Sequence, residues 1–394
     1  MKFLNIRNLE SYILTFFNLL KIYLIINRRF KNNKKLKFIL FYFPVKTYQE
    51  NILDLVKKMK KNKNIFIFLI YNKYSSSGIS KQKNSLLIDF GYLRFVPFSN
   101  IFLNKINLFI SNDVAYIYPP KSTNIYISHD ITDIQMVNKE MEKKVFSAFL
   151  KIDYIFLSSD IVVKYFIKKF KLFFKKKKLR TPKLINTGYL KLDHVKKKLN
   201  LFKNKRDSIV IAPTARFYKK EHNISTDLEN IIDNLLKFTK EKIIYRPHPV
   251  DLTKKGDNNF VEGIINKFNK NKNFSADLSK SYLNSYSKAK FLITDFSSTA
   301  FTFAYSTLCP VVFYSKNEKK LNITELVSSA YYKDRLKVGY ITNNVIQILT
   351  IIKKISLTKS KLRIKIINLR KKRIKYLNQS LNKTYKEITN IIKS

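Results

Sequence analysis

Short apolar runs alternate with longer, lysine-rich amphipathic segments between residues 37 and 350. The runs at 37–44, 64–71, 208–213 and 290–295 are mostly apolar at successive positions, which predicts strands buried on both faces of a sheet. The segments between the runs have the spacing of amphipathic helices. This alternation predicts an α/β fold with parallel sheets covered by helices.

The alternation occurs in two successive series of strand candidates. The first series continues at 106–110, 115–119, 124–128 and 154–158, and the second at 242–247, 273–277 and 310–314. We therefore predict two Rossmann-like domains facing each other across a cleft, with basic helical N- and C-terminal extensions. The predicted parts are a basic amphipathic N-terminal segment, an acceptor domain, a linker, a nucleotide-donor domain and a basic helical tail, at 1–36, 37–193, 194–207, 208–350 and 351–394.

Composition adds a strong positive charge to this picture. The chain has 77 Lys and Arg against 27 Asp and Glu, a net charge of +50, yet 45% of its residues are hydrophobic. That apolar content excludes a disordered basic tail and leaves three kinds of acidic partner: phosphorylated ligands, anionic lipid and nucleic acid. Only 12 of the cations are Arg and no nucleic-acid motif is present, so no specific nucleic acid is expected. The single cysteine, Cys309, excludes a disulfide framework.

Residues 11–26 form the longest apolar stretch, flanked by Arg7, Arg28 and Arg29 and interrupted by Lys21. This stretch is short for a membrane-spanning helix, which needs about 20 residues. One interpretation is an amphipathic helix on the anionic inner face of the cell membrane; the other is a first helix packed on its domain. We expect a cytoplasmic protein that is peripheral to the membrane.

Phosphate chemistry is suggested by TDFSSTAF (294–301), between a strand and a helix. Asp295, Ser297, Ser298 and Thr299 come at the helix start, where free backbone N–H groups and the helix dipole favour an anion. The alternative is that one serine only caps the helix. The usual phosphate loops and the Asp-x-Asp pair that holds a metal are missing from the sequence. We therefore expect an anion site without a metal or another cofactor.

Two further motifs come directly after predicted strands of the second domain. YRPHP (245–249) places Arg246 and His248 at a strand end, and APTAR (212–216) places Thr214 and Arg216 at another. Carboxyl ends of parallel strands meet at one edge of a sheet, so the three motifs together outline a phosphate pocket.

In the first domain, NIYISHDITD (124–133) places His129 at a strand end with Asp130 beside it. A histidine next to carboxylates can act as a general base, although a structural histidine is the alternative. NTGYLKLD (186–193) offers Gly188 for a tight turn and Asp193 to cap the segment after it.

Taken in this order, the segments resemble those of the CDP-glycerol glycerophosphotransferase family, the teichoic-acid primases and polymerases. The resemblance rests on the motifs around His129, Gly188, Thr214, Arg246 and Asp295, and on CPVVFY (309–314). It implies a GT-B fold, His129 as the base that deprotonates the acceptor hydroxyl, and a donor diphosphate held by residues Arg216, His248, Ser297 and Ser298 without a metal. Two positions differ from the family pattern: Asp130 and Ile131 come after His129, and Thr302 stands where an Asp is usual.

We therefore predict a transferase that moves glycerol phosphate, or a related polyol phosphate, from a CDP-activated donor to a lipid-linked or polymeric acceptor. The product would be a teichoic-acid-like or capsular cell-surface polymer. His129 and His248 are the candidate catalytic residues, and Thr214, Arg216, Arg246, Asp295, Ser297, Ser298 and Thr299 are the candidate donor-binding residues. The alternative is a GT-B glycosyltransferase with a CMP- or UDP-sugar donor, similar to sialyltransferases.

Overall fold

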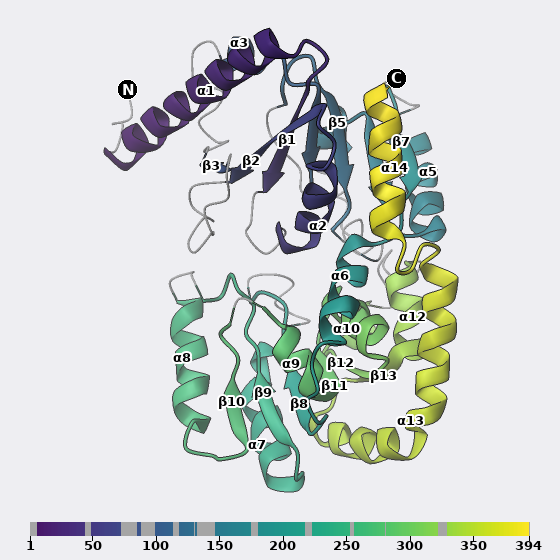
Figure 1. Ribbon diagram of the computed structural model, residues 1–394. Helices are drawn as coiled ribbons and strands as arrows, with labels where there is room; N and C mark the ends of the chain where they lie inside the picture. Colours follow the sequence, from purple (N-terminus) through teal and green to yellow (C-terminus); the bar gives the residue numbers. More distant parts are fainter. Residues whose placement is uncertain are drawn as a thin grey trace. The chain divides into compact units, whose positions relative to one another are not determined.

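The computed structural model describes residues 6–43, 49–71, 85–87, 99–112, 118–129, 131, 146–174, 180–216, 223–252, 256–279, 281–321 and 329–393. Within them the chain forms two compact units (Figure 1). The first unit contains the chain up to His129, the residues from Phe146 to Asp193, and the C-terminal residues from Lys375. The second unit contains His194–Ile374.

A parallel sheet is the centre of the first unit, and its described strands lie in the order β3-β2-β1-β4-β5-β6-β7. The strands are β1 (Lys37–Phe43), β2 (Ile65–Tyr71), β3 (Ser85–Leu87), β4 (Leu108–Ser111), β5 (Thr123–Ile127), β6 (Tyr154–Leu157) and β7 (Lys183–Asn186). The helices are α1 (Ile6–Asn32), α2 (Gln49–Met59), α3 (Ser99–Phe102), α5 (Asp160–Phe174), α6 (Leu190–Leu199), which runs into the second unit, and α14 (Ser380–Lys393).

Both faces of this sheet are covered, because strands such as β1 and β2 bury apolar side chains toward each face. Phe38 and Leu40 of β1 pack with α1 and α3 on one face. Ile39 and Phe41 pack on the other face with α2 and with Ile388 of α14. The C-terminal helix therefore completes the core of the first unit.

A second parallel sheet has the order β10-β9-β8-β11-β12-β13. Its strands are β8 (Ser208–Ile211), β9 (Lys242–Tyr245), β10 (Phe274–Ala276), β11 (Ala289–Thr294), β12 (Val311–Tyr314) and β13 (Gly339–Thr342). The helices are η7 (Ile224–Thr226), α7 (Leu228–Phe238), α8 (Asp257–Phe268), α9 (Leu283–Lys288), α10 (Thr299–Thr307), α11 (Glu318–Leu321), α12 (Ala330–Val338) and α13 (Val345–Arg373). Helices α7, α8 and α13 pack on one face of the sheet.

Each sheet contains the strand order 3-2-1-4-5-6 of a doubly wound Rossmann fold. The predicted α/β class and the two Rossmann-like units are confirmed. In the second sheet the order reverses between β8 and β11, and ligands bind at the carboxyl ends of strands at such a reversal.

The sequence pattern missed three short strands, β3, β7 and β13. β13 forms by parallel pairing of Gly339 to Thr342 with β12. Such edge strands are fixed by a neighbouring strand and carry little signal of their own. The predicted strand at 115–119 lies mostly outside the described residues.

Candidate active site

Three predicted segments lie at the same edge of the second sheet. Strand β8 pairs in parallel with both β9 and β11, so the residues directly after these strands are neighbours. Thr214 comes after β8, Arg246 after β9 and Asp295 after β11. The grouping predicted from the sequence is thus present in the fold.

Asp295 ties two of these segments together. Its carboxylate is buried and accepts hydrogen bonds from the backbone N–H groups of Thr214 (3.0 Å) and Ile224 (3.1 Å). Burial raises the pKa of Asp295 to about 6, and the two hydrogen bonds oppose that rise. The sequence suggested Asp295 as a donor-binding residue; in the structure the carboxylate faces these amides and holds the loop after β8 in place.

Asn223 is a second support of this loop, and sequence reasoning missed it. Its side-chain Nδ2 donates to the carbonyl and hydroxyl oxygens of Thr214 and to the carbonyl of Ala215, at 3.2–3.3 Å. Its Oδ1 accepts from the backbone N–H of Ser225 at the start of η7. An asparagine ahead of a short helical turn is a capping signal, and this was the only clue in the sequence.

Hydroxyl groups of Ser297, Ser298 and Thr299 surround the start of α10, and all three residues are partly exposed. Ser298 occupies the N-cap position but makes no side-chain capping hydrogen bond. Two buried tyrosines support the turn from behind: Tyr286 Oη lies 2.5 Å from Thr299 Oγ1, and Tyr331 Oη donates to the Ser297 carbonyl at 3.2 Å. The turn is also braced by its own groups, because Ser297 Oγ accepts a hydrogen bond from the Thr299 N–H at 3.3 Å, while the three residues stay partly exposed.

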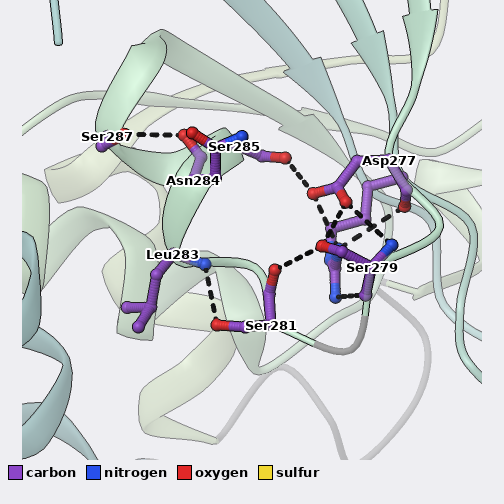
Figure 2. Close-up of polar contacts among 8 residues, drawn as sticks. Asp277, Ser279, Ser281, Leu283, Asn284, Ser285 and Ser287 are labelled. Carbon is purple, nitrogen blue, oxygen red and sulfur yellow. Dashed lines mark hydrogen bonds and ion pairs between the residues drawn. The ribbon is translucent and has the colours of Figure 1, made fainter.

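Arg246 is buried and paired within the protein. Its Nη1 lies 2.8 Å from Asp277 Oδ2, with the two side chains 9% and 12% exposed, and its Nη2 donates to the Ser279 carbonyl at 3.0 Å. Ser279 and Ser285 in turn donate to the Asp277 carboxylate (Figure 2). Burial alone would raise the pKa of Asp277, but these hydrogen bonds and the Arg246 charge hold it below its usual value. The guanidinium predicted to bind the donor therefore joins the ends of β9 and β10.

Arg216 is also paired. Its backbone N–H donates to Asp251, its Nη1 lies 3.1 Å from Asp257 Oδ1, and its guanidinium stacks 3.8 Å from the centre of the Phe260 ring. The side chain keeps 29% of its surface exposed, so it remains more accessible than Arg246.

His248 has its tautomer fixed by the backbone. Nδ1 accepts a hydrogen bond from the Val250 N–H at 3.3 Å, so a neutral ring carries its proton on Nε2. Burial, and after it the charge of Arg246, lowers the pKa of His248 below the usual value, which favours the neutral ring. His248 can therefore donate a hydrogen bond from Nε2.

His129 of the first unit has the opposite tautomer. Its Nδ1 lies 2.6 Å from the backbone carbonyl oxygen of Asn112, which can only accept, so Nδ1 carries the proton. The lone pair is left on Nε2, the form that a general base needs. Tyr189 Oη donates to the backbone carbonyl of His129 and holds the residue at the end of β5. Asp130, its predicted companion, lies outside the described residues.

Gly188 and Asp193 hold the C-terminal helix. Gly188 has φ +79°, and a Cβ there would lie 2.5 Å from Ser380 Oγ and 2.9 Å from Tyr376 Cβ. The Asp193 carboxylate accepts from the backbone N–H groups of Asn378 (2.7 Å) and Ser380 (2.9 Å). Asp193 thus caps α14, almost two hundred residues away along the chain.

Among the described residues, no group of three His, Cys, Asp or Glu side chains could hold a metal ion. Cys309 is buried, and its sulfur accepts a hydrogen bond from Arg206 at 2.6 Å.

Two Rossmann-type sheets of this kind define an α/β enzyme with the GT-B fold. Solved structures with this fold match nearly the whole chain. The wall teichoic acid polymerase TagF has 15% identity and a TM-score of 0.63, over 96% of this chain and 98% of that one. The UDP-GlcNAc 2-epimerase from Methanocaldococcus jannaschii has 12% identity and a TM-score of 0.60, over 90% of this chain and 100% of that one. At these identities the likeness shows the fold.

The family is shown by the sequence itself. Residues 22–390 match the family described as CDP-Glycerol:Poly(glycerophosphate) glycerophosphotransferase, and the chain belongs to this family. It is a transferase. Among curated proteins, no sequence matches this chain.

Proposed function

We propose that this enzyme transfers glycerol phosphate from CDP-glycerol to a hydroxyl group of a growing wall polymer. Membership of the glycerophosphotransferase family supports the reaction, and a TagF variant of the same fold was soaked with CDPG. The observation that carries the proposal within the chain is the 2.6 Å hydrogen bond between His129 Nδ1 and the Asn112 carbonyl, because it places the ring proton on Nδ1 and the lone pair on Nε2.

His129 is the base in this proposal. The acceptor oxygen attacks the β-phosphorus of CDP-glycerol while its proton passes to His129 Nε2. A P–O bond forms to the acceptor, and the anhydride P–O bond breaks with its electron pair leaving on CMP. The products are a phosphodiester and CMP, so each turnover lengthens the acceptor by one glycerol phosphate.

The second unit binds the diphosphate. The hydroxyls of Ser297, Ser298 and Thr299 at the start of α10 supply hydrogen bonds, and the helix dipole favours the negative charge there. Nε2–H of neutral His248 adds a donor that stabilises the departing CMP, and Arg216 is the more exposed cation beside it. Asp295, Asn223 and Arg246 hold these groups in position.

A donor screen tests the reaction class. Purified protein is incubated with a glycerol-phosphate acceptor and with CDP-glycerol, CDP-ribitol, CMP-sialic acid or a UDP-sugar, and nucleotide release and acceptor extension are both measured. Extension with CDP-glycerol is expected. Transfer of sialic acid or another sugar without transfer of glycerol phosphate would replace the proposal with the glycosyltransferase alternative.

The role of His129 is tested by His129→Ala, with His194→Ala as a control that removes an imidazole from α6. Loss of a general base should lower kcat by about 10²- to 10⁴-fold while CMP binding stays unchanged. Losing the Nε2–H donor in His248→Ala should instead weaken CMP binding by about 10- to 100-fold. A His129→Ala enzyme that keeps most of its kcat would remove His129 as the base.

We further propose that α1 holds the enzyme on an anionic membrane that carries a lipid-linked acceptor. Leu19, Ile22 and Ile26 of α1 are buried in the first unit, whereas Phe17 and Leu24 on its other face are 61% and 58% exposed. The packed face agrees with a first helix on its domain, and the exposed apolar face is the part that supports the proposed contact with lipid. No described helix is long and apolar enough to cross a membrane.

Substitution is a cleaner test of this contact than deletion. Removing α1 would uncover Phe38 and Phe66 of the core it covers, so loss of binding could reflect misfolding. Phe17→Ser with Leu24→Ser changes only the exposed face and should reduce the fraction that sediments with anionic vesicles. An unchanged bound fraction would exclude α1 as the anchor.

A further inference from the structure

A cation-lined hollow lies at the amino-terminal edge of the second sheet. It has a volume of about 660 Å³, and its wall contains Asp207, Glu241 and Lys290, which precede or begin strands β8, β9 and β11. The candidate donor site lies beyond the carboxyl ends of the same strands. Thr214 comes seven positions after Asp207, so the two edges are roughly 20 Å apart at about 3.3 Å per residue.

The hollow has an excess of positive charge. Five cations and two carboxylates line it among the residues that the structure describes. Both carboxylates have basic partners: Glu241 pairs with Lys290 at 2.7 Å, and Asp207 pairs with Lys242 at 3.0 Å. Lys205, Lys240 and Lys353 are exposed and add charge at the rim.

Large apolar side chains surround the same hollow. Phe238, at the end of α7, lines it and is 67% exposed. Leu349 and Ile352 of α13 form another part of the wall. On the outer side of α13, Ile346 is 69% exposed and Leu357 is 88% exposed.

Helix α13 is bent, as Figure 1 shows. Ser356 and Thr358 hydrogen-bond back to the carbonyls of Ile352 and Lys354, a pattern that bends helices. Ile346 and Lys353 precede the bend, and Leu357 lies at it, between Ser356 and Thr358. Their spacing of 7 and 4 residues places the three side chains on one face. From Ile346 to Leu357 this face is about 16 Å long at 1.5 Å per residue.

From these features we propose that the first arm of α13 and the adjoining hollow form a membrane-docking surface of the second unit, with Ile346, Leu357 and Phe238 entering the acyl boundary and the lysines of the hollow binding lipid phosphates. An apolar ridge bordered by lysines is the composition of an interfacial helix. The charged residues of this first arm, Lys353 and Lys354, are both cationic, which complements an anionic bilayer. This surface is independent of α1. Its use in bringing the enzyme to a lipid-linked acceptor rests on the proposed function.

A bilayer fits these residues better than a soluble polyanion. Lysines alone would be enough to bind a soluble phosphodiester chain. In that case the exposed apolar side chains of Ile346, Leu357 and Phe238 would have no partner and would stay in water. Single-stranded nucleic acid is bound by successive aromatic side chains, and among the described residues that line the hollow only Phe238 is aromatic.

Vesicle binding tests the charge contribution. The full chain carries Phe17→Ser and Leu24→Ser to remove the contribution of α1, and Lys240→Gln with Lys353→Gln is added. Partitioning onto vesicles with 30% phosphatidylglycerol should fall about 25-fold, about fivefold for each lysine. The matched control, Lys319→Gln with Lys333→Gln, removes two exposed lysines associated with α11 and α12 of the same unit and should leave partitioning within about twofold. Equal losses in the two double variants would overturn the proposal.

A fluorescent probe tests the docking face directly. Leu357→Cys is labelled with an environment-sensitive dye, since the native Cys309 is buried, and Lys333→Cys carries the control dye. Anionic vesicles should shift the emission of the dye at position 357 to shorter wavelength and leave the control unchanged. No shift at 357, or an equal shift on adding soluble poly(glycerol phosphate) or a single-stranded oligonucleotide, would overturn bilayer docking.

Transfer to a soluble acceptor without vesicles separates this proposal from the proposed function. The Lys240→Gln, Lys353→Gln variant should retain wild-type turnover in that assay. If the unchanged chain fails to transfer glycerol phosphate but still shows the lysine-dependent vesicle binding and the dye shift at position 357, the proposed function fails and the docking surface stands.

Discussion

Replacing Arg246 with methionine separates a positioning role of this residue from a role in binding the donor. Methionine has a similar length and no charge, so the change removes the ion pair with Asp277 and the hydrogen bond to Ser279. If Arg246 only joins the ends of β9 and β10, the loss should appear in stability. If it contacts the donor phosphates, the loss should appear in affinity.

The expected magnitude depends on burial. Both members of the Arg246–Asp277 pair are about nine-tenths buried, and removing one partner of a buried pair costs about 3–5 kcal/mol. Asp277 keeps its hydrogen bonds from Ser279 and Ser285, so we expect the lower end, about 3 kcal/mol. Lys237→Met removes the exposed pair with Asp233 and should cost no more than about 0.5 kcal/mol.

The dependence on pH gives a second signature. The pKa of Asp277 is lowered in the folded protein, so its contribution to stability is present above the unfolded pKa, near 3.9, and is lost as the pH falls through the lower folded value. Without the Arg246 charge the folded pKa rises toward the unfolded one. The acid-induced loss of stability should therefore be smaller in Arg246→Met than in the unchanged chain.

Amide hydrogen exchange of peptides that cover β9 and β10 is the appropriate assay, because a chain of two units need not unfold in one step. CMP affinity is measured alongside, at a temperature where the variant is folded, and should change by less than about tenfold. A variant with unchanged exchange and CMP binding weakened by 10- to 100-fold, the loss expected for a hydrogen bond to a charged group, would refute the positioning role.

Three further predictions concern single residues. Gly188→Ala should destabilise the first unit by at least about 2 kcal/mol in denaturant unfolding, since φ is +79° and the added Cβ would meet Ser380; an unchanged midpoint would show that α14 shifts freely. Asp193→Ala should cost about 1–2 kcal/mol through loss of the α14 cap and speed hydrogen exchange at the start of that helix, whereas slow exchange there would mean that other groups cap it. In an NMR titration, His248 should have a pKa below the usual 6.5, and in Arg246→Met its pKa should lie closer to 6.5. The contribution of His248 to stability is therefore present above pH 6.5 and is lost as the pH falls through the folded pKa. A measured pKa above 6.5 would contradict a neutral His248 ring in the folded protein.

Much of the fold could be predicted because the relevant signals are local. Apolar runs such as IFIFLIY of β2 indicate buried parallel strands wherever they occur, and the helical spacing between them requires no knowledge of partners. The short strands β3 and β13 escaped prediction because pairing with a neighbour, and not their own residues, makes them strands.

The sequence predicted which residues come together at this sheet edge, but it did not predict the contacts that each of them makes. The sequence alone placed Thr214, Arg246 and Asp295 at strand ends of one sheet edge, since connection order and strand direction are set by the pattern. It could not indicate that Arg246 is paired with Asp277, or that Asp295 binds two backbone amides. Asn223, which braces Thr214, had no signal beyond its place before a short turn.

By itself the sequence determined the α/β class, the two Rossmann-like units and the residues from which a phosphate site could be built. These features depend on hydrophobic periodicity and on the residue types at strand ends, and both involve residues that are close together along the chain. Only the tertiary structure decided which charges are available to a ligand and which are used within the protein. Arg246 and Asp193 bind groups that come together only when the chain folds, and the exposure of Leu357 depends on what α13 packs against. Pairing and burial are set by the whole fold, so they could not be inferred from neighbours along the chain.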